Sequence, residues 1–178
     1  MGGKLPPLPA ADLDKALQER RQEFDLAIKQ TIPQALARLQ NEQVMLPVSV
    51  ELSGIFRFAH RLDSTERWQE QETSCAEARE RLLAGEAFAT VAAQMSQGAT
   101  KELGGRLGPR FLDPLDELDQ QLARLKPHEI SPVFEVDNGF WCYRLENRTA
   151  GKSMSFNEMP WAAKRILLRQ TLNQLMVD

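Results

Sequence analysis

The sequence predicts an α+β protein in which a small, mainly antiparallel sheet is flanked by helices. Three observations support this prediction. Both ends of the chain carry apolar residues at helical spacing, residues 55–62 alternate between apolar and polar side chains, and Asn138-Gly139 separates two short apolar segments. Because Asn-Gly favours the tight turn of a hairpin, we expect antiparallel strands.

The composition narrows the class of protein. The chain has 178 residues, a hydrophobic content of 42% and a net charge of −3, which fits one globular domain with an appendage. The acidic balance argues against a nucleic-acid binder, since these usually present a basic face. No run of 18 apolar residues exists, so no membrane span is expected. The start lacks the apolar run of a signal peptide. We therefore expect a cytoplasmic protein, or a periplasmic one if a leader was removed.

No metal or cofactor is expected. Two cysteines, Cys75 and Cys142, do not form a disulfide framework, and we interpret both as small apolar fillers. Together with His60 and His128 they lack the CxxC or HxxxH spacing of a metal site. The glycine turn at residues 104–108 is followed by Pro-Arg rather than by the Lys-Ser/Thr of a phosphate loop.

The N-terminal part is predicted to be a helix that follows a short tail. Residues 1–10 are rich in Gly and Pro, and we expect them to be disordered or extended. Residues 12–43 have helical periodicity, and Pro33 should kink or divide this helix, while Pro47 closes the segment. The apolar residues of this pattern are Leu13, Leu17, Phe24, Ala27, Ile28, Ile32, Leu36 and Leu39.

One strand and two helices are predicted next. Residues 55–62 alternate with period two and predict a strand with Phe56, Phe58, His60 and Leu62 on one face. The sequence Ser74-Cys75-Ala76-Glu77 is a capping box, which predicts a helix from there to Ala84 with Gly85 as its left-handed end. A second helix is predicted from the apolar spacing of Phe88, Val91, Ala92 and Met95.

The C-terminal half is predicted to contain a short helix, a hairpin and a final helix. Leucines at helical spacing lie in residues 114–125, and residues 133–136 and 140–145 form the expected hairpin. A second capping box, Ser155-x-x-Glu158, predicts the start of the last helix. Its apolar stripe consists of Leu168, Leu172, Leu175 and Met176.

The order of these motifs resembles the parvulin family of peptidyl-prolyl isomerases. The resemblance covers roughly residues 53–149 and rests on linked features. These are His60 in the first strand, the helix step ending in Gly85-Glu86-Ala87-Phe88, the turn Gly104-Gly105-x-Leu107-Gly108, and Glu129-Ile130-Ser131-x-Val133 before the hairpin. It implies a four-stranded antiparallel sheet wrapped by helices.

The resemblance also implies where an active site would lie. His60 takes the place of a catalytic histidine, and Leu115 and Leu118 fall where the family keeps a Met and a Phe that grip proline. Phe111 and Trp141 complete the expected substrate-binding set. Trp141 stands where a second histidine is usual, and Ser96-Gln97-Gly98 where an Asp or Cys is usual.

Each of these residues also has a structural interpretation. Trp141 can be a core aromatic on the sheet, and His60 a buried histidine whose hydrogen bonds are satisfied. Leu115 and Leu118 can simply pack inward from a helix. The residues alone leave both interpretations open.

The flanking helices, in residues 11–47 and 155–178, resemble those of longer bacterial foldases, in which such helices pack into a chaperone module around the isomerase domain. The resemblance implies a polypeptide client, either proline-containing or unfolded. A remaining exposed apolar face on these helices would bind clients or form a homodimer. Two hypotheses follow: a parvulin-type isomerase and foldase, or a catalytically degenerate parvulin-like domain that acts as a chaperone or assembly module.

Overall fold

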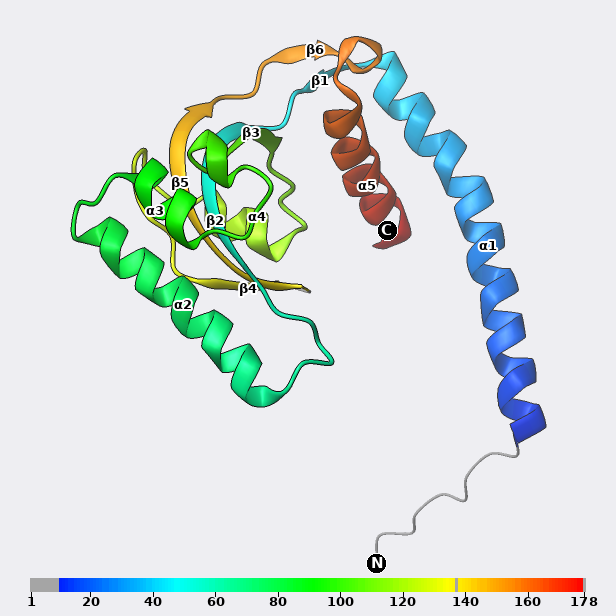
Figure 1. The fold of residues 1–178 in the computed structure, drawn as a ribbon. Coiled ribbons are helices and arrows are strands. Elements are labelled where there is room, and N and C mark those ends of the chain that lie inside the picture. The colour runs from blue at the N-terminus through cyan, green and yellow to red at the C-terminus, as the bar shows by residue number, and fades with distance from the viewer. Residues whose placement is uncertain (1–9, 137, 178) are drawn as a thin grey trace, which may run out of the picture. The chain divides into compact units, whose positions relative to one another are not determined.

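The computed structural model describes residues 10–136 and 138–177, which divide into two compact units. One unit comprises residues 45–153, and the other comprises the residues before and after it. The expected parvulin-like segment, 53–149, lies inside the first of these. Figure 1 shows the elements of both units in chain order.

The larger unit is built on a four-stranded antiparallel sheet, which confirms the predicted α+β class. The strand order is β3-β2-β5-β4. The strands are β2 (Ser49–Phe58), β3 (Arg106–Phe111), β4 (Phe134–Val136) and β5 (Gly139–Thr149). The expected hairpin is present, with Val136 opposite Gly139. Asp137, within its turn, lies outside the described residues.

Strand β2 corrects the prediction of a strand through Leu62. It begins six residues earlier than expected and ends at Phe58. Beyond that point the Asp63 carboxylate accepts the His60 N–H at 2.8 Å, and the His60 ring accepts the Leu62 N–H at 3.2 Å. Such side chain–backbone hydrogen bonds replace the ladder of a sheet and turn the chain. His60 and Leu62 therefore lie in a loop.

Helix α2 (Thr65–Leu83) corrects the predicted capping box. The N-cap is Ser64, whose hydroxyl accepts the Arg67 N–H at 3.3 Å, and Ser74 lies well inside the helix. The predicted end is confirmed. Gly85 has φ +93°, its N–H donates to Leu82, and the next N–H, of Glu86, donates to Arg81. This pair of bonds is a Schellman motif.

The remaining helices of this unit are short. The predicted second helix is confirmed as α3 (Phe88–Met95), a 3₁₀-helix covers Lys101–Leu103, and α4 (Glu117–Leu122) falls within the predicted segment 114–125. Helices α2 and α3 pack against one side of the sheet (Figure 1).

Two apolar cores lie on opposite faces of the sheet, because successive residues of a strand point to opposite sides. The first core lies against α2 and α3 and contains Ile55, Ala59, Cys75, Ala78, Leu82, Phe88, Val91, Ala92, Phe140 and Cys142. The second core lies against α4 and contains Val50, Leu52, Leu112, Leu122, Leu125, Phe134, Tyr143 and Leu145. Both cysteines are buried and unpaired, as interpreted from the sequence.

The smaller unit is helical. Helix α1 (Ala10–Asn41) packs against α5 (Trp161–Val177). Helix α1 runs through Pro33 without dividing, and Ala35 and Leu39 beyond it are buried. Strand β1 (Gln43–Met45) pairs with β6 (Ser153–Ser155) where the chain passes between the units.

Of three further predictions for this unit, one is wrong and two concern residues that lie wholly or partly outside what the structure describes. The second capping box is wrong for α5, because Ser155 precedes a separate 3₁₀-helix (Phe156–Glu158) and makes no side-chain cap bond. The predicted tail lies outside the described residues up to residue 9, and Ala10 is already helical. The side chains of Leu13, Leu17, Phe24, Ala27 and Ile28 also lie outside what the structure describes. None of the helices described is long and apolar enough to span a bilayer.

Candidate functional site

Three aromatic side chains stack on the face of the sheet that carries the second core. Phe56 and Trp141 have ring centroids 4.7 Å apart at an interplanar angle of 27°, and Trp141 and Tyr143 are 5.3 Å apart at 3°. We call Phe56, Trp141 and Tyr143 the ring stack. Phe58 meets Phe56 edge-on at 6.4 Å, and Phe134 lies 6.0 Å from Tyr143.

The register of the sheet builds this stack. Phe56 of β2 lies directly opposite Trp141 of β5, and Tyr143 is two residues further along β5 on the same face. Phe58 is 41% exposed at one end of the row, whereas Tyr143 is buried at the other. The row of rings therefore leads from the core to solvent.

Gly54 makes room for the indole of Trp141. A Cβ atom at Gly54 would lie 2.8 Å from the Trp141 Cζ3 atom and 2.8 Å from the Leu107 Cδ1 atom. Contacts this short do not occur between real side chains, so Gly54 and Trp141 are complementary. Leu107 is thereby also placed beside the ring stack.

The glycine turn positions Leu107 by docking on β2. Gly54 donates its N–H to the Gly105 carbonyl at 2.8 Å. Gly105 has φ +76°, and a Cβ there would lie 2.8 Å from the Gly54 carbonyl oxygen. Only glycine permits both this conformation and this close approach.

The segment Ser96–Gly98 lies along β2 beside the ring stack. The Gln97 N–H donates to Phe56 at 2.8 Å, and the Gln97 side-chain oxygen accepts the Phe58 N–H at 2.6 Å. The Ser96 hydroxyl accepts the Phe56 N–H at 3.1 Å. Ser96 and Gln97, which the resemblance places where an Asp or Cys is usual, thus hydrogen-bond the strand through their side chains.

Leu118 lies in α4, and Leu115 lies just before that helix. Leu118 packs against the second core, as does Trp141. Leu115 is 43% exposed in the segment between β3 and α4. The structure thus brings Leu118 and Trp141 to one core and leaves Leu115 accessible to solvent.

Phe111 is placed differently from the other candidate residues. Its neighbour Arg110 reaches Asp119 of α4, and its other neighbour, Leu112, belongs to the second core. Because adjacent strand residues alternate between faces, the ring of Phe111 points away from the ring stack.

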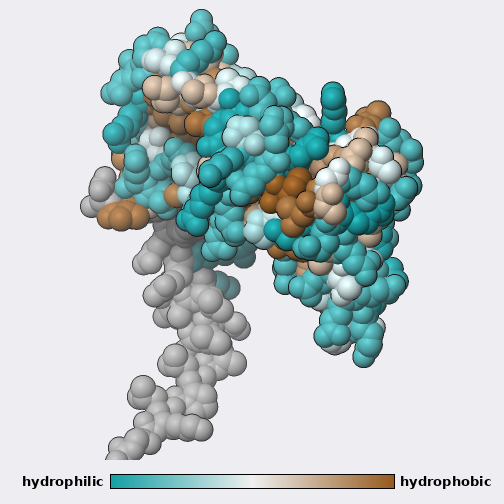
Figure 2. Space-filling model, turned by 90° about the vertical axis from the view of Figure 1, so that its left-hand side faces the viewer, coloured by the Kyte–Doolittle hydropathy of each residue, from teal (hydrophilic) through white to brown (hydrophobic). Residues whose placement is uncertain are grey.

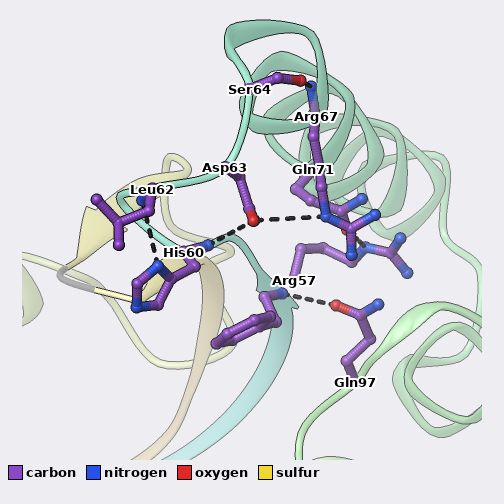
Figure 3. Close-up of polar contacts among 9 residues, drawn as sticks. Arg57, His60, Leu62, Asp63, Ser64, Arg67, Gln71 and Gln97 are labelled. Carbon is purple, nitrogen blue, oxygen red and sulfur yellow. Dashed lines mark hydrogen bonds and ion pairs between the residues drawn. The ribbon is translucent and has the colours of Figure 1, made fainter.

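His60 is exposed in the loop between β2 and α2, two residues beyond Phe58 (Figure 3). Its Nδ1 accepts the Leu62 N–H, which leaves the other ring nitrogen, Nε2, outside this hydrogen bond. Asp63, which fixes the His60 backbone, also pairs with Arg67 at 3.4 Å. His60 is therefore held by local hydrogen bonds outside the sheet, and not by burial in a core.

The electrostatics of the stack are those of an apolar surface. Burial raises the pKa of Tyr143 well above its usual value, with the nearby Arg110 opposing that shift. Tyr143 is therefore neutral at physiological pH. Among the described residues no group of three or more His, Cys, Asp or Glu side chains could hold a metal ion.

The sequence alone did not identify four residues of this site: Gly54, Phe56, Leu107 and Tyr143. The alternation of residues 55–62 placed Phe56 and Phe58 on one face, which was the available signal for Phe56. Nothing in the pattern linked Gly54 to Trp141, because that contact joins two strands that are far apart in the chain.

The surface is mostly polar, and one groove lies apart from the ring stack. Figure 2 shows a mostly hydrophilic surface on which apolar side chains gather in small patches. A separate groove of about 1080 Å³ lies on the α3 side of the sheet. Its lining includes Phe88, Arg106, Arg144 and Glu146, so it is distinct from the ring stack.

Comparisons with known proteins agree with this architecture. The family model described as a PpiC-type peptidyl-prolyl isomerase domain matches residues 60–159. The crystal structure of a PpiC-type peptidyl-prolyl cis-trans isomerase domain is 25% identical, with a TM-score of 0.52, and the match covers 60% of this chain and 96% of that one. A search of curated proteins finds no match.

A second solved structure extends the likeness of fold to the flanking helices. The peptidylprolyl isomerase PrsA from Bacillus cereus is 16% identical with a TM-score of 0.52, and the match covers 96% of this chain and 69% of that one. The family match spans more than half of the chain and confirms the resemblance read from the sequence. The chain belongs to the parvulins, the family of PpiC-type peptidyl-prolyl cis-trans isomerase domains.

Proposed function

We propose that this chain is a parvulin-type isomerase and foldase that binds proline-containing or unfolded polypeptide segments at the ring stack. Family membership supports foldase and isomerase function. The ring stack is the observation that supports this location, since it offers an apolar aromatic surface that runs out to solvent at Phe58.

The proposed reaction is rotation about the peptide bond that precedes proline. Its barrier is about 18–20 kcal/mol because the amide has partial double-bond character. No covalent step is needed. An enzyme accelerates rotation when it binds the twisted amide better than the planar one. An apolar surface suits the twisted form, because that form has lost the charge separation of the conjugated amide.

The proposed roles follow the placement of each side chain. Trp141, Leu115 and Leu118 would grip the proline ring and its neighbours, and His60 would contact the amide from the β2–α2 loop through Nε2. Phe111 would act through its backbone, since its ring points to the other face. The placement of Leu107 next to Trp141 adds this leucine to the proposed binding surface.

A second candidate function is a catalytically degenerate parvulin that binds clients without isomerising them. One observation favours it: Trp141 packs over Gly54, and the uncharged Gln97 side chain is bonded to the strand, so the two positions where the resemblance expects a histidine and an Asp or Cys carry no ionisable group. Of the polar residues that the resemblance expects in the active site, only His60 would then remain to stabilise the twisted amide electrostatically.

A protease-coupled isomerase assay separates the two functions. Peptides with several different residues before proline should be isomerised faster by the wild-type chain than by buffer. His60→Ala should lower kcat, whereas Trp141→Ala should mainly weaken binding. A matched control is Glu117→Gln, an exposed change on α4. A rate equal to the uncatalysed rate for every peptide would exclude the isomerase, and suppression of client aggregation by the same sample would then support the second function.

We further propose that residues 11–47 and 155–178 form a helical module that can bind clients or a second copy of the chain. Apolar residues of α5 support this, since Trp161, Met176 and Val177 are exposed. Light scattering after size-exclusion chromatography would show a homodimer by its mass. A cytoplasmic location, or a periplasmic one after removal of a leader, is testable by cell fractionation.

A further inference from the structure

A buried carboxylate organises the segment that carries Leu115 and Leu118. Asp119 of α4 is 3% exposed. Its Oδ1 accepts the Arg110 Nε–H at 2.6 Å, and its Oδ2 accepts the Asp113 N–H at 2.9 Å. One side chain therefore connects the end of β3, the following segment and α4.

Further hydrogen bonds extend this connection to Leu115 itself. The Asp113 carboxylate, fixed by its own N–H bond to Asp119, accepts the Leu115 N–H at 2.9 Å. The Asp119 backbone N–H in turn donates to the Asp116 carboxylate at 3.0 Å, and the side-chain amide of Gln120 donates to the Pro114 carbonyl at 2.7 Å. Asp119 thus lies at the centre of a hydrogen-bond network that includes the Leu115 N–H.

The physical chemistry makes Asp119 hard to replace. Both carboxylate oxygens are used, one by a guanidinium and one by a backbone N–H, and hydrogen bonds to a charged acceptor are the stronger kind. An asparagine replaces one of these oxygens by an NH₂ group, which would face a donor without accepting from it, so the hydrogen bond to Arg110 or the one to Asp113 is lost. The Arg110 side chain is 46% exposed, so it can turn to water when its partner is lost.

We propose that Asp119 is the positioning residue of the client-binding wall: its buried carboxylate holds the β3–α4 segment so that Leu115 and Leu118 are placed to grip a client beside Trp141. This inference rests on the proposed function for its consequence, because the wall matters only if clients bind there. We call the hydrogen bonds of Asp119 to Arg110 and Asp113 the clamp. Amide hydrogen exchange measures the clamp independently of client binding.

The test compares Asp119→Asn with Glu117→Gln, an exposed change on the same helix, in the full-length chain. Amide hydrogen exchange is followed at Asp113 and Leu115, and KM and kcat are measured with a proline peptide. Because the wall grips ground state and transition state alike, we expect faster exchange at both amides, a KM raised about tenfold and an unchanged kcat for Asp119→Asn. Glu117→Gln should leave all three at wild-type values. Arg110→Met, at a half-exposed position, should show the same pattern in weaker form and serves if Asp119→Asn does not fold.

The outcomes separate the clamp from the proposed function. Unchanged exchange at Asp113 and Leu115 would overturn the inference, as would faster exchange with an unchanged KM. If the wild-type chain neither binds nor isomerises proline peptides, the proposed function fails. The exchange readout then decides the clamp alone: faster exchange in Asp119→Asn supports it, and unchanged exchange refutes it.

Discussion

At residue 128 a histidine occupies a backbone conformation that favours glycine. His128 has φ +65° and is the one non-glycine residue with positive φ in the described part of the chain. It follows Pro127 in a turn closed by the Glu129 N–H and the Lys126 carbonyl at 3.0 Å. This is the pattern of a type II turn, whose third position requires positive φ.

We expect His128→Gly to stabilise the protein by about 1 kcal/mol, because the exposed histidine loses no described packing and the backbone strain is relieved. Urea unfolding would measure the difference. A matched His60→Gly change, in a loop without positive φ, should give no such gain. A His128→Gly variant that is less stable than wild type would contradict this explanation.

Burial of the two cysteine thiols makes the stability of the folded protein depend on pH. Burial raises the pKa of Cys75 to about 12, with Cys142 nearby adding to the shift, and burial likewise raises the pKa of Cys142 to about 11. The unfolded chain has thiols of ordinary pKa, near 9.0. Between pH 9 and 11 the unfolded state therefore holds fewer protons than the folded state, and stability falls as pH rises.

The free energy of unfolding should fall by up to about 1.4 kcal/mol per pH unit for each thiol in that interval. Denaturant titrations at pH 8, 9, 10 and 11 would show the slope, and Cys142→Ala should reduce it. Ellman's reagent should react with neither thiol in the folded protein at pH 8 and with both after unfolding. Fast reaction of the folded protein would refute the burial on which the argument depends.

For the helices and strands, the residues at which each element begins and ends were harder to predict than whether it is a helix or a strand. Helix α2 was expected to begin at the capping box formed by Ser74 and Glu77, but its cap is Ser64. A capping box needs Glu or Gln three residues after the N-cap, and Ser64 is followed there by Arg67. The sequence rule therefore selected Ser74 and Glu77, which lie inside the helix. The end of α2 was predictable, because Gly85 adopts the left-handed conformation that local chemistry favours.

Two serine substitutions compare the rival starts of α2. Ser64→Ala should destabilise the protein by about 1 kcal/mol, because the Arg67 N–H loses its acceptor. Ser74→Ala should change stability by less than about 0.5 kcal/mol, because alanine is the better helix former at an interior position. Thermal unfolding of both variants would measure the difference. A larger loss for Ser74→Ala would restore the predicted boundary.

Strand β3 is the strand of the four-stranded sheet that the sequence did not reveal. Gly108 and Pro109 interrupt any alternation across Arg106–Phe111, and the register with β2 shifts opposite Leu52 and Ser53. Proline and a bulge are typical of an edge strand, which need not offer a continuous ladder. Only the pairing with β2, which is non-local, defines this strand.

At the scale of the molecule, the α+β class and the helices at both ends followed from periodicity, and the family followed from the order of motifs. The site was only partly predictable. Trp141, Leu115 and Leu118 were placed by their offsets from the hairpin and glycine turn. The structure brings Trp141 and Leu118 to the second core and leaves Leu115 exposed. The complementarity of Gly54 with Trp141 was not predictable, since it depends on the register of β2 against β5.

We propose that clients bind at the ring stack. Chemical-shift mapping of the isotope-labelled chain, titrated with a proline-containing peptide, tests it most directly. We predict the largest shifts at Phe56, Leu107, Leu115 and the Trp141 indole N–H, with a weaker dissociation constant in Trp141→Ala. Shifts confined to the groove beside Phe88 and Arg144, or binding unchanged in Trp141→Ala, would contradict it.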